Sequence, residues 1–131
     1  MYLFDTNICI YIINKHPKKV VRNIYTLDPH YVKISSITVA ELEYGVSKSG
    51  RREQNRIALY NFLSPLEIVP FDSRDAEIYG LIRAELERQG KPIGPYDLQL
   101  AAQALARELI LVTNNTAEFS RIKQLNVENW S

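Results

Sequence analysis

The sequence has little of what disulfide frameworks and thiol or imidazole metal sites need. Its 131 residues include one cysteine, Cys9, and two histidines, His16 and His30. One cysteine excludes a disulfide framework and any zinc or redox site built on a CxxC motif, and two histidines exclude a histidine-rich metal site. Cys9 lies among isoleucines at positions 8, 10, 12 and 13, which predicts a buried structural thiol rather than a nucleophile.

The sequence also lacks an excess of charge of one sign and a long hydrophobic run. Sixteen Lys and Arg against 15 Asp and Glu leave a net charge of +1, which argues against electrostatic coating of nucleic acid or membrane but leaves local patches open. No window reaches the roughly 18 apolar residues of a membrane span. The N-terminal segment MYLFDTNICIYII lacks the basic start and the small-residue cleavage site of a signal peptide. We therefore expect a cytoplasmic protein that does not contact membrane.

What the sequence does contain is a regular alternation of short apolar runs with longer amphipathic segments. No repeat, low-complexity tract or Gly/Ser linker interrupts it, which predicts one domain over residues 1–131. Strands are predicted at residues 2–4, 31–35, 66–69 and 109–113, with a further short strand around Val127. Helices are predicted at residues 8–13, 20–27, 38–46 (capped by Thr38, with Gly45 near its end), 52–63, 76–86 (capped by Asp72 or Ser73 and ended by Gly90) and from Pro95 to residue 105. This alternation predicts an α/β fold with a central parallel β-sheet flanked by α-helices on both faces.

Four carboxylates follow or face the predicted strand ends. Asp5 closes the first strand, Glu41 begins the helix after the second, Asp97 lies in the first turn of the alanine-rich helix, and Glu118 follows the strand at residues 109–113. Because ligands of open parallel sheets bind outside the carboxyl ends of the strands, we expect all four at one edge. The other acidic residues considered are expected on solvent faces or beside Lys and Arg; they are Glu43, Glu53, Glu67, Asp75, Glu77, Glu85, Glu87, Glu108 and Glu128.

Converging carboxylates repel one another unless some are protonated or a cation lies among them. Mg²⁺ or Mn²⁺ suits such a site because both prefer oxygen ligands, can activate a bound water and can offset charge on a phosphodiester. Each carboxylate also has an ordinary structural interpretation. Asp5 caps the following helix, Glu41 completes a capping box with Thr38, and Asp97 complements a helix dipole. Taken singly, the two interpretations are about equally favoured, and the shared edge favours the site.

Four blocks of the chain, in order, resemble a known family. The segments LFDTNICIYII, SSITVAELEYG, PIGPYDLQLAAQA and LVTNNTAEF, with the stretch RAELERQGKPIGPYD, are similar to the motif regions of PIN-domain ribonucleases, specifically the VapC toxins of bacterial VapBC toxin–antitoxin modules. The resemblance spans nearly the whole chain. It implies a PIN-like α/β fold, Mg²⁺- or Mn²⁺-dependent RNA cleavage and a homodimer.

The same resemblance implies partners, a substrate and metal-site residues. It implies inhibition by a VapB antitoxin that inserts a segment at the active site, with DNA contacted only through the antitoxin. The PIGPYD-type loop points to the anticodon stem–loop of initiator tRNA as the RNA substrate. Matched position by position, the motifs assign catalytic and metal-binding roles to Asp5, Glu41 and Asp97.

The sequence departs from the wider PIN pattern at one position. Many PIN proteins carry an acidic residue two positions after the threonine that ends the fourth strand, and here that position is Asn115. Glu118 is the nearest acidic substitute, and it is expected to complete the catalytic and metal-binding set directly or through water. Asn115 can hydrogen-bond a metal-bound water. Thr6 and Thr113, which flank the predicted site, are expected to support it.

Three other interpretations were weighed. A receiver-like module that accepts a phosphoryl group with Mg²⁺ needs an acid next to Asp5 and a lysine near Thr113, and the sequence has neither. A catalytically idle partner that only anchors the antitoxin shares the fold and differs in activity. A metal-independent ribonuclease that uses two histidines is disfavoured because His16 and His30 fall in loops beside prolines.

Basic and aromatic side chains have ordinary explanations at this stage. A solvated helix face is favoured over RNA contact for the basic stretch at residues 48–56, whose cations are Lys48, Arg51, Arg52 and Arg56. Packing or a dimer surface is favoured over base stacking for the tyrosines of the predicted helices, namely Tyr11, Tyr25, Tyr44, Tyr60 and Tyr79.

Overall fold

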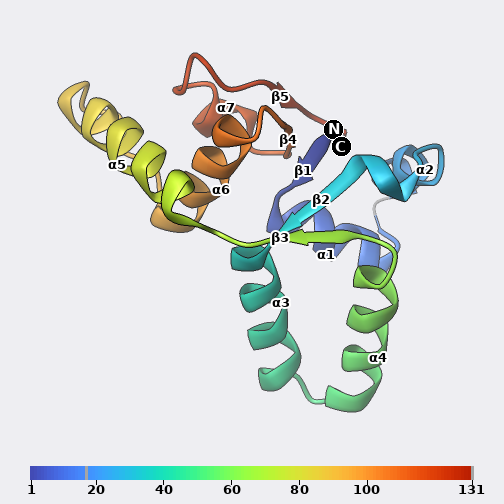
Figure 1. The fold of residues 1–131 in the computed structure, drawn as a ribbon. Coiled ribbons are helices and arrows are strands. Elements are labelled where there is room, and N and C mark those ends of the chain that lie inside the picture. The colour runs from blue at the N-terminus through green and yellow to red at the C-terminus, as the bar shows by residue number, and fades with distance from the viewer. Residues whose placement is uncertain (17, 131) are drawn as a thin grey trace.

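A five-stranded, all-parallel sheet with the strand order β3-β2-β1-β4-β5 forms the centre of the protein (Figure 1). It is seen in a computed structural model that describes residues 1–16 and 18–130. The predicted α/β fold with a central parallel sheet is confirmed, the short last strand included. The strands are β1 (Tyr2–Phe4), β2 (Val32–Ser35), β3 (Glu67–Val69), β4 (Ile110–Val112) and β5 (Val127–Glu128).

Helices cover both faces of the sheet because successive strand residues point to opposite sides. Leu3 and Leu111 belong to one buried cluster, whereas their neighbours Phe4 and Val112 belong to a second. The first cluster is completed by side chains of α5, α6 and α7, and the second by side chains of α1, α2, α3 and α4. The helices are α1 (Thr6–Asn14), α2 (Lys18–Tyr25), η1 (Pro29–Tyr31), α3 (Ser36–Lys48), α4 (Arg52–Leu63), α5 (Ser73–Arg88), α6 (Pro95–Ala106) and α7 (Thr116–Phe119).

The start of α3 differs from the prediction. Ser35 caps this helix, because its hydroxyl accepts the Ile37 N–H at 3.0 Å, so Thr38 is not the cap and lies fully buried in the first turn. Gly45 does not stop the helix, which runs on to Lys48. The cap must have extended backbone, and Ser35, at the end of β2, has it. Burial of Val46 against the core outweighs the roughly 1 kcal/mol that an interior glycine costs a helix.

The starts of α5 and α6 follow their local signals. Asp72 caps α5 and shares a capping box with Asp75, while Pro95 is the first residue of α6. Gly90, at φ 69°, follows the end of α5 in the left-handed conformation that glycine adopts without strain. These positions confirm the boundaries that the sequence predicts for both helices.

Asp75 does not lie on a solvent face, where the sequence allows it to lie. Its side chain is 1% exposed, and its Oδ2 lies 3.2 Å from Nη2 of Arg107, the C-cap residue of α6. The basic neighbour is therefore a residue 32 positions away rather than the adjacent Arg74. Burial is tolerated because Asp75 gains the guanidinium partner and the capping-box hydrogen bond.

Across residues 1–16 and 18–130, none of the helices has the length and apolar character needed to cross a membrane.

Candidate active site

Four carboxylates lie together at the carboxyl edge of the sheet. Asp5 directly follows β1, and its N–H donates to the Val112 carbonyl of β4 at 3.0 Å. Glu41 lies in α3 after β2, and Glu118 in α7 after β4. Asp97 reaches the same edge because α6 leads into β4, which places the first turn of α6 beside the strand ends.

The raised pKa of Asp97 indicates that the four carboxylates lie close to one another. Burial raises it most, the negative charges of Glu118, Asp5 and Glu41 add to the rise, and together they bring the pKa from its ordinary value of 3.8 to about 6. Because like charges act on a pKa only over short distances, the four carboxylates share one electrostatic environment. The structure thus brings together the residues that the sequence selects.

Asp5 both caps a helix and lines the cleft described below. Its Oδ1 accepts the Ile8 N–H at 2.9 Å and caps α1, and its Oδ2 accepts the Thr113 hydroxyl. Burial raises the pKa of Asp5, the hydrogen bonds from Thr113 and Ile8 lower it, and the charge of Glu41 raises it, with a net rise. The capping interpretation of Asp5 is therefore confirmed, and the same side chain lines the cleft, where its metal-binding role stays a prediction.

Threonines position two of the carboxylates. Besides the Thr113 hydrogen bond to Asp5, the Thr6 hydroxyl lies 3.0 Å from Oε1 of Glu41, to which it donates, and 3.2 Å from Oγ1 of Thr38. The Asn115 N–H donates to Oγ1 of Thr113 at 3.0 Å. These bonds fix the Asp5 and Glu41 side chains from α1 and from the segment after β4.

Glu118 joins α7 to the loop that precedes α6. Its Oε2 accepts from Nδ2 of Asn115 at 2.6 Å, and its Oε1 accepts from the Gly94 N–H at 3.3 Å. Gly94 is the N-cap of the helix that carries Asp97. Glu118 therefore lies near Asp97 with both of its oxygens already accepting hydrogen bonds from the protein.

Asp5, Glu41 and Asp97 line a cleft of about 650 Å³, whereas Glu118 does not line it. The lining residues that were not assigned to the site from the sequence include Tyr44, Lys48 and Tyr96. Tyr44 and Lys48 lie three and seven residues after Glu41, which is the spacing of one helix face, and Tyr96 precedes Asp97. This spacing is the signal by which the sequence could have placed them. The complete lining is Asp5, Thr6, Asn7, Ile10, Ile37, Ala40, Glu41, Tyr44, Gly45, Lys48, Tyr96 and Asp97.

The donor set fits a hard divalent cation. All candidate ligands are carboxylates, and their mutual repulsion, seen in the raised pKa of Asp97, is what a cation among them would relieve. Within the described part of the chain, no three His, Cys, Asp or Glu side chains are arranged to hold one ion together. Mg²⁺ is usually bound by one or two carboxylates and several waters, so this arrangement suits an ion held partly through water.

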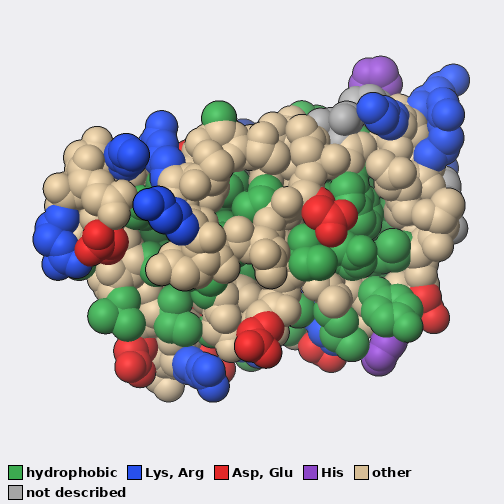
Figure 2. Space-filling view, turned by 90° about the horizontal axis from the view of Figure 1, so that it is seen from above, with side chains coloured by type: hydrophobic (Ala, Val, Ile, Leu, Met, Phe, Trp, Pro, Cys, Tyr) green, Lys and Arg blue, Asp and Glu red, His purple; other side chains and the backbone are tan. Residues whose placement is uncertain are grey.

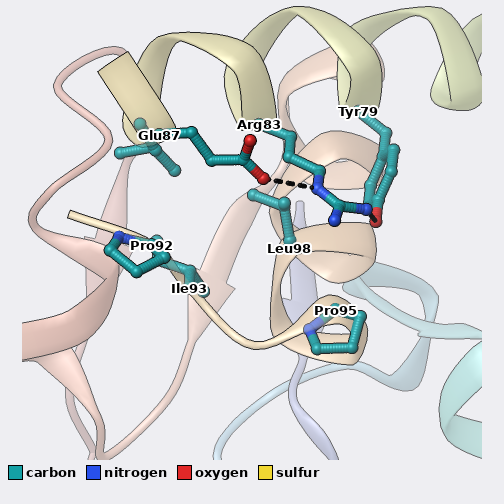
Figure 3. A pocket seen from close by; sticks show the side chains of 8 residues that line it. Tyr79, Arg83, Glu87, Pro92, Ile93, Pro95 and Leu98 are labelled. Carbon is teal, nitrogen blue, oxygen red and sulfur yellow. Dashed lines mark hydrogen bonds and ion pairs between the residues drawn. The ribbon is translucent and has the colours of Figure 1, made fainter. Parts of the chain in front are cut away.

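A second, smaller cavity of about 160 Å³ lies between α5 and the start of α6 (Figure 3). Its one cation, Arg83, is already engaged, because Nε donates to Oε1 of Glu87 at 2.9 Å and Nη1 donates to Oη of Tyr79 at 3.0 Å. Pro92 and Ile93 of the loop before α6 line the opposite side in Figure 3. This cavity belongs to the scaffold that carries the Asp97 loop and has no carboxylate cluster.

Known proteins resemble this chain over its whole length. Residues 2–125 match the PIN domain family. Ribonuclease VapC2 of Rickettsia felis is 50% identical over 131 residues, which cover 99% of this chain and 98% of the relative. The tRNA(fMet)-specific endonuclease VapC of Shigella flexneri is 44% identical over 130 residues, which cover 99% and 98%.

Solved structures agree with the sequence comparisons. The crystal structure of VapBC2 from Rickettsia felis, bound to a DNA fragment from their promoter, contains a chain that superposes with a TM-score of 0.92 at 49% identity. The crystal structure of DNA-bound VapBC from Salmonella typhimurium contains one with a TM-score of 0.93 at 42% identity. Both matches cover 99% of this chain and 98% of the other chain.

Proposed function

This chain belongs to the PIN domain family, as one of its VapC ribonucleases, and from that premise we propose that it is a toxic endoribonuclease that hydrolyses RNA phosphodiester bonds with Mg²⁺ or Mn²⁺. The observation that carries the proposal is the gathering of Asp5, Glu41, Asp97 and Glu118 at one sheet edge, reflected in the Asp97 pKa of about 6. Such a cluster has a clear use around a divalent cation and little use without one.

Each residue of the cleft has a definable task. Asp5, Glu41 and Asp97 would hold the cation partly through bound waters, and Glu118 would complete the set directly or through water. When bound, the cation supplies an activated water and offsets the charge that develops on the phosphodiester. The Thr113 and Ile8 hydrogen bonds orient Asp5, and Thr6 orients Glu41. The Glu118 to Gly94 hydrogen bond fixes the start of α6 and thereby Asp97. Asn115 supports this bond from its side-chain amide.

The leading substrate is the anticodon stem–loop of initiator tRNA. Relatives from Shigella flexneri and Salmonella typhimurium, 44% and 43% identical, are named tRNA(fMet)-specific endonucleases. The partner that neutralises the toxin is a VapB antitoxin, as the two VapBC complexes with DNA suggest. We propose further that the chain acts in the cytoplasm as a homodimer and meets DNA only through the antitoxin.

Of the two rival functions, the receiver-like one loses support at the same cleft. Phosphoryl acceptance of the receiver type needs a second acid beside Asp5 and a lysine after a late strand, whereas Thr6 and Asn114 occupy the corresponding places. A catalytically idle anchor for the antitoxin would share the fold, so an activity measurement must separate it from the nuclease.

The experiment is incubation of the purified, antitoxin-free chain with total RNA and with tRNA, with Mg²⁺, with Mn²⁺ and with excess EDTA. We expect discrete cleavage products with either metal and none in EDTA. The matched control is Asp97→Asn, which keeps the side-chain volume and removes the charge. Cleavage that persists undiminished in EDTA, or that Asp97→Asn leaves intact, would contradict the proposal.

A further inference from the structure

Two large aromatic side chains stand exposed at the acidic cleft. Tyr44 of α3 is 66% exposed and Tyr96 of α6 is 58% exposed, and both line the cleft beside Glu41 and Asp97. Neither tyrosine belongs to the two buried clusters that hold the helices to the sheet. The fold therefore does not explain why aromatic rings stand at these two positions.

The acidic lining of the cleft would repel the negatively charged phosphates of an RNA substrate. Its ionisable lining residues are three acids, Asp5, Glu41 and Asp97, one lysine, Lys48, and two tyrosines, and the whole chain has a net charge of only +1. Non-specific binding of nucleic acids normally comes from cations that neutralise phosphates. A carboxylate-lined cleft with one lysine therefore gains from contacts that do not depend on charge, and stacking of bases on aromatic rings is such a contact.

Lys48 is placed to complement these rings. Its Nζ lies 4.9 Å from the centre of the Tyr44 ring, one helical turn away on the same face of α3. No ion pair with a carboxylate is found for Lys48 among the described residues. Arg56 of the same basic stretch, by contrast, is paired with Glu43 at 2.8 Å. Of the cations in that stretch, Lys48 is the one that lines the cleft.

We propose that Tyr44 and Tyr96 are substrate-positioning residues on which bases next to the scissile phosphate stack, while Lys48 contacts a neighbouring phosphate. The inference rests on the proposed nuclease function and adds the form of RNA that the cleft accepts. Bases in a duplex already stack on their neighbours, so two exposed rings at the cleft select an unpaired segment. For Tyr44, this replaces the packing or dimer surface that the sequence favours.

RNA binding tests the inference without relying on cleavage. The binding protein is the full-length Asp5→Asn chain, in which Asn keeps the capping hydrogen bond and cleavage is blocked. The probes are a labelled oligouridylate and a labelled RNA duplex of the same length, each titrated by fluorescence anisotropy in Mg²⁺. Tyr44→Ala and Tyr96→Ala are compared with Tyr44→Phe and Tyr96→Phe, and Tyr60→Ala is the control, because Tyr60 is 71% exposed on α4 and does not line the cleft.

We expect each alanine variant to raise the Kd for the single strand by about 5- to 150-fold, the range that loss of one stacked base gives. The phenylalanine variants and Tyr60→Ala should stay near the parent, and the duplex should bind weakly throughout. Lys48→Ala should reduce the slope of log K against log salt by about 0.7, the value of one phosphate contact on a single strand. In the otherwise wild-type chain, the alanine variants should raise KM more than they lower kcat.

The outcomes separate this inference from the function on which it rests. If wild-type protein cleaves RNA with Mg²⁺ while both alanine variants bind the single strand as the parent does, the inference is overturned and the nuclease function stands. If they bind RNA normally but change the oligomeric state or antitoxin binding, the rings contact protein and the inference is again wrong. If the wild-type chain neither cleaves nor binds RNA, both fail. Unchanged melting temperatures of the alanine variants, expected for exposed rings, exclude misfolding as the cause.

Discussion

Among single residues, Asp97 should make the stability of the metal-free protein depend on pH. Its pKa is about 6 in the folded chain and near 3.8 when unfolded, so the folded state binds its proton more tightly. The free energy of unfolding should therefore fall as pH rises from about 4 to about 6 and level off above. The pKa of Asp5 is also raised and acts in the same direction.

The check is a series of thermal melts between pH 4 and pH 8 in EDTA. Asp97→Asn should flatten the profile and hold or raise the melting temperature at pH 7, because it removes one of the repelling charges. The matched control is Glu53→Gln, an exposed acid on α4. A profile that is equally steep in the wild type and Asp97→Asn would show that Asp97 is not the titrating group.

Glu118 and Asn115 are the two candidates for the fourth metal-site residue, and their geometry favours Glu118. Glu118 carries a negative charge near Asp97 and accepts the Gly94 N–H, whereas Asn115 is neutral and hydrogen-bonds only Glu118 and Thr113 among the residues of the site. We expect Glu118→Gln to lower Mg²⁺ affinity and cleavage by about 10- to 100-fold. Asn115→Ala should do less, because Glu118 keeps its charge and its bond to Gly94.

Titration of Mg²⁺ into both variants, followed by cleavage rate, decides between them. If Asn115→Ala is the more damaging change and Glu118→Gln behaves as the wild type, Glu118 has no metal-site role. The set would then consist of Asp5, Glu41 and Asp97 alone.

At the scale of elements, local sequence signals predicted the helix starts and strand ends that depend only on residues close in sequence. Asp72 and Pro95 mark helix starts because caps and first-turn prolines act over a few residues. The strand ends placed the four carboxylates at one edge for the same reason. The cap of α3 was misplaced because SSITV offers three hydroxyls, and only the extended backbone at Ser35 selects one.

Contacts between distant segments were not visible in the sequence. Arg107 meets Asp75 across 32 positions, and Glu118 meets Gly94 across 24. No periodicity or spacing encodes such pairs, because the packing of α6 against α5 and α7 creates them. For this reason the sequence did not show that Asp75 is buried beside Arg107 rather than on a solvent face. Of the two explanations for Tyr44, its 66% exposure contradicts packing, and a dimer surface is not tested.

The Arg107 to Asp75 pair should hold the start of α5 onto α6. Asp75 is 1% exposed, so Arg107→Met would leave a buried carboxylate without its ion-pair partner. We expect a loss of about 2–4 kcal/mol in the free energy of unfolding, below the fully buried range because 29% of the Arg107 side chain is exposed.

Urea denaturation measures this loss against a matched pair on the surface. Arg56→Met removes the exposed ion pair with Glu43 and should cost about 0–1 kcal/mol. Adding Asp75→Asn to Arg107→Met should recover part of the stability, because it removes the isolated charge. Equal losses for Arg107→Met and Arg56→Met would show that burial of Asp75 contributes little.

At the scale of the whole molecule, positive and negative charges nearly cancel in number but are unevenly distributed over the surface. On the face shown in Figure 2, Lys and Arg gather at the α5 end and at the α2 end, with mostly neutral and apolar side chains and some acidic ones between them. The acids of the cleft gather at the carboxyl edge of the sheet. A net charge of +1 conceals this separation. RNA and antitoxin must therefore recognise local surfaces rather than a general field.

The proposed toxin function leads to a prediction in cells. Expression of this chain alone should arrest growth, because a nuclease that cleaves initiator tRNA stops translation, and co-expression of a VapB antitoxin should restore growth. An arginine of the antitoxin suits the acidic cleft, since a guanidinium can pair with carboxylates through two hydrogen bonds. Growth curves with inducible toxin and antitoxin provide the measurement, and Asp97→Asn is the matched control that should be harmless at equal abundance. Arrest by Asp97→Asn as strong as that by the wild type would mean that the toxicity does not come from cleavage, and harmless expression of soluble wild-type protein would contradict the toxin function itself.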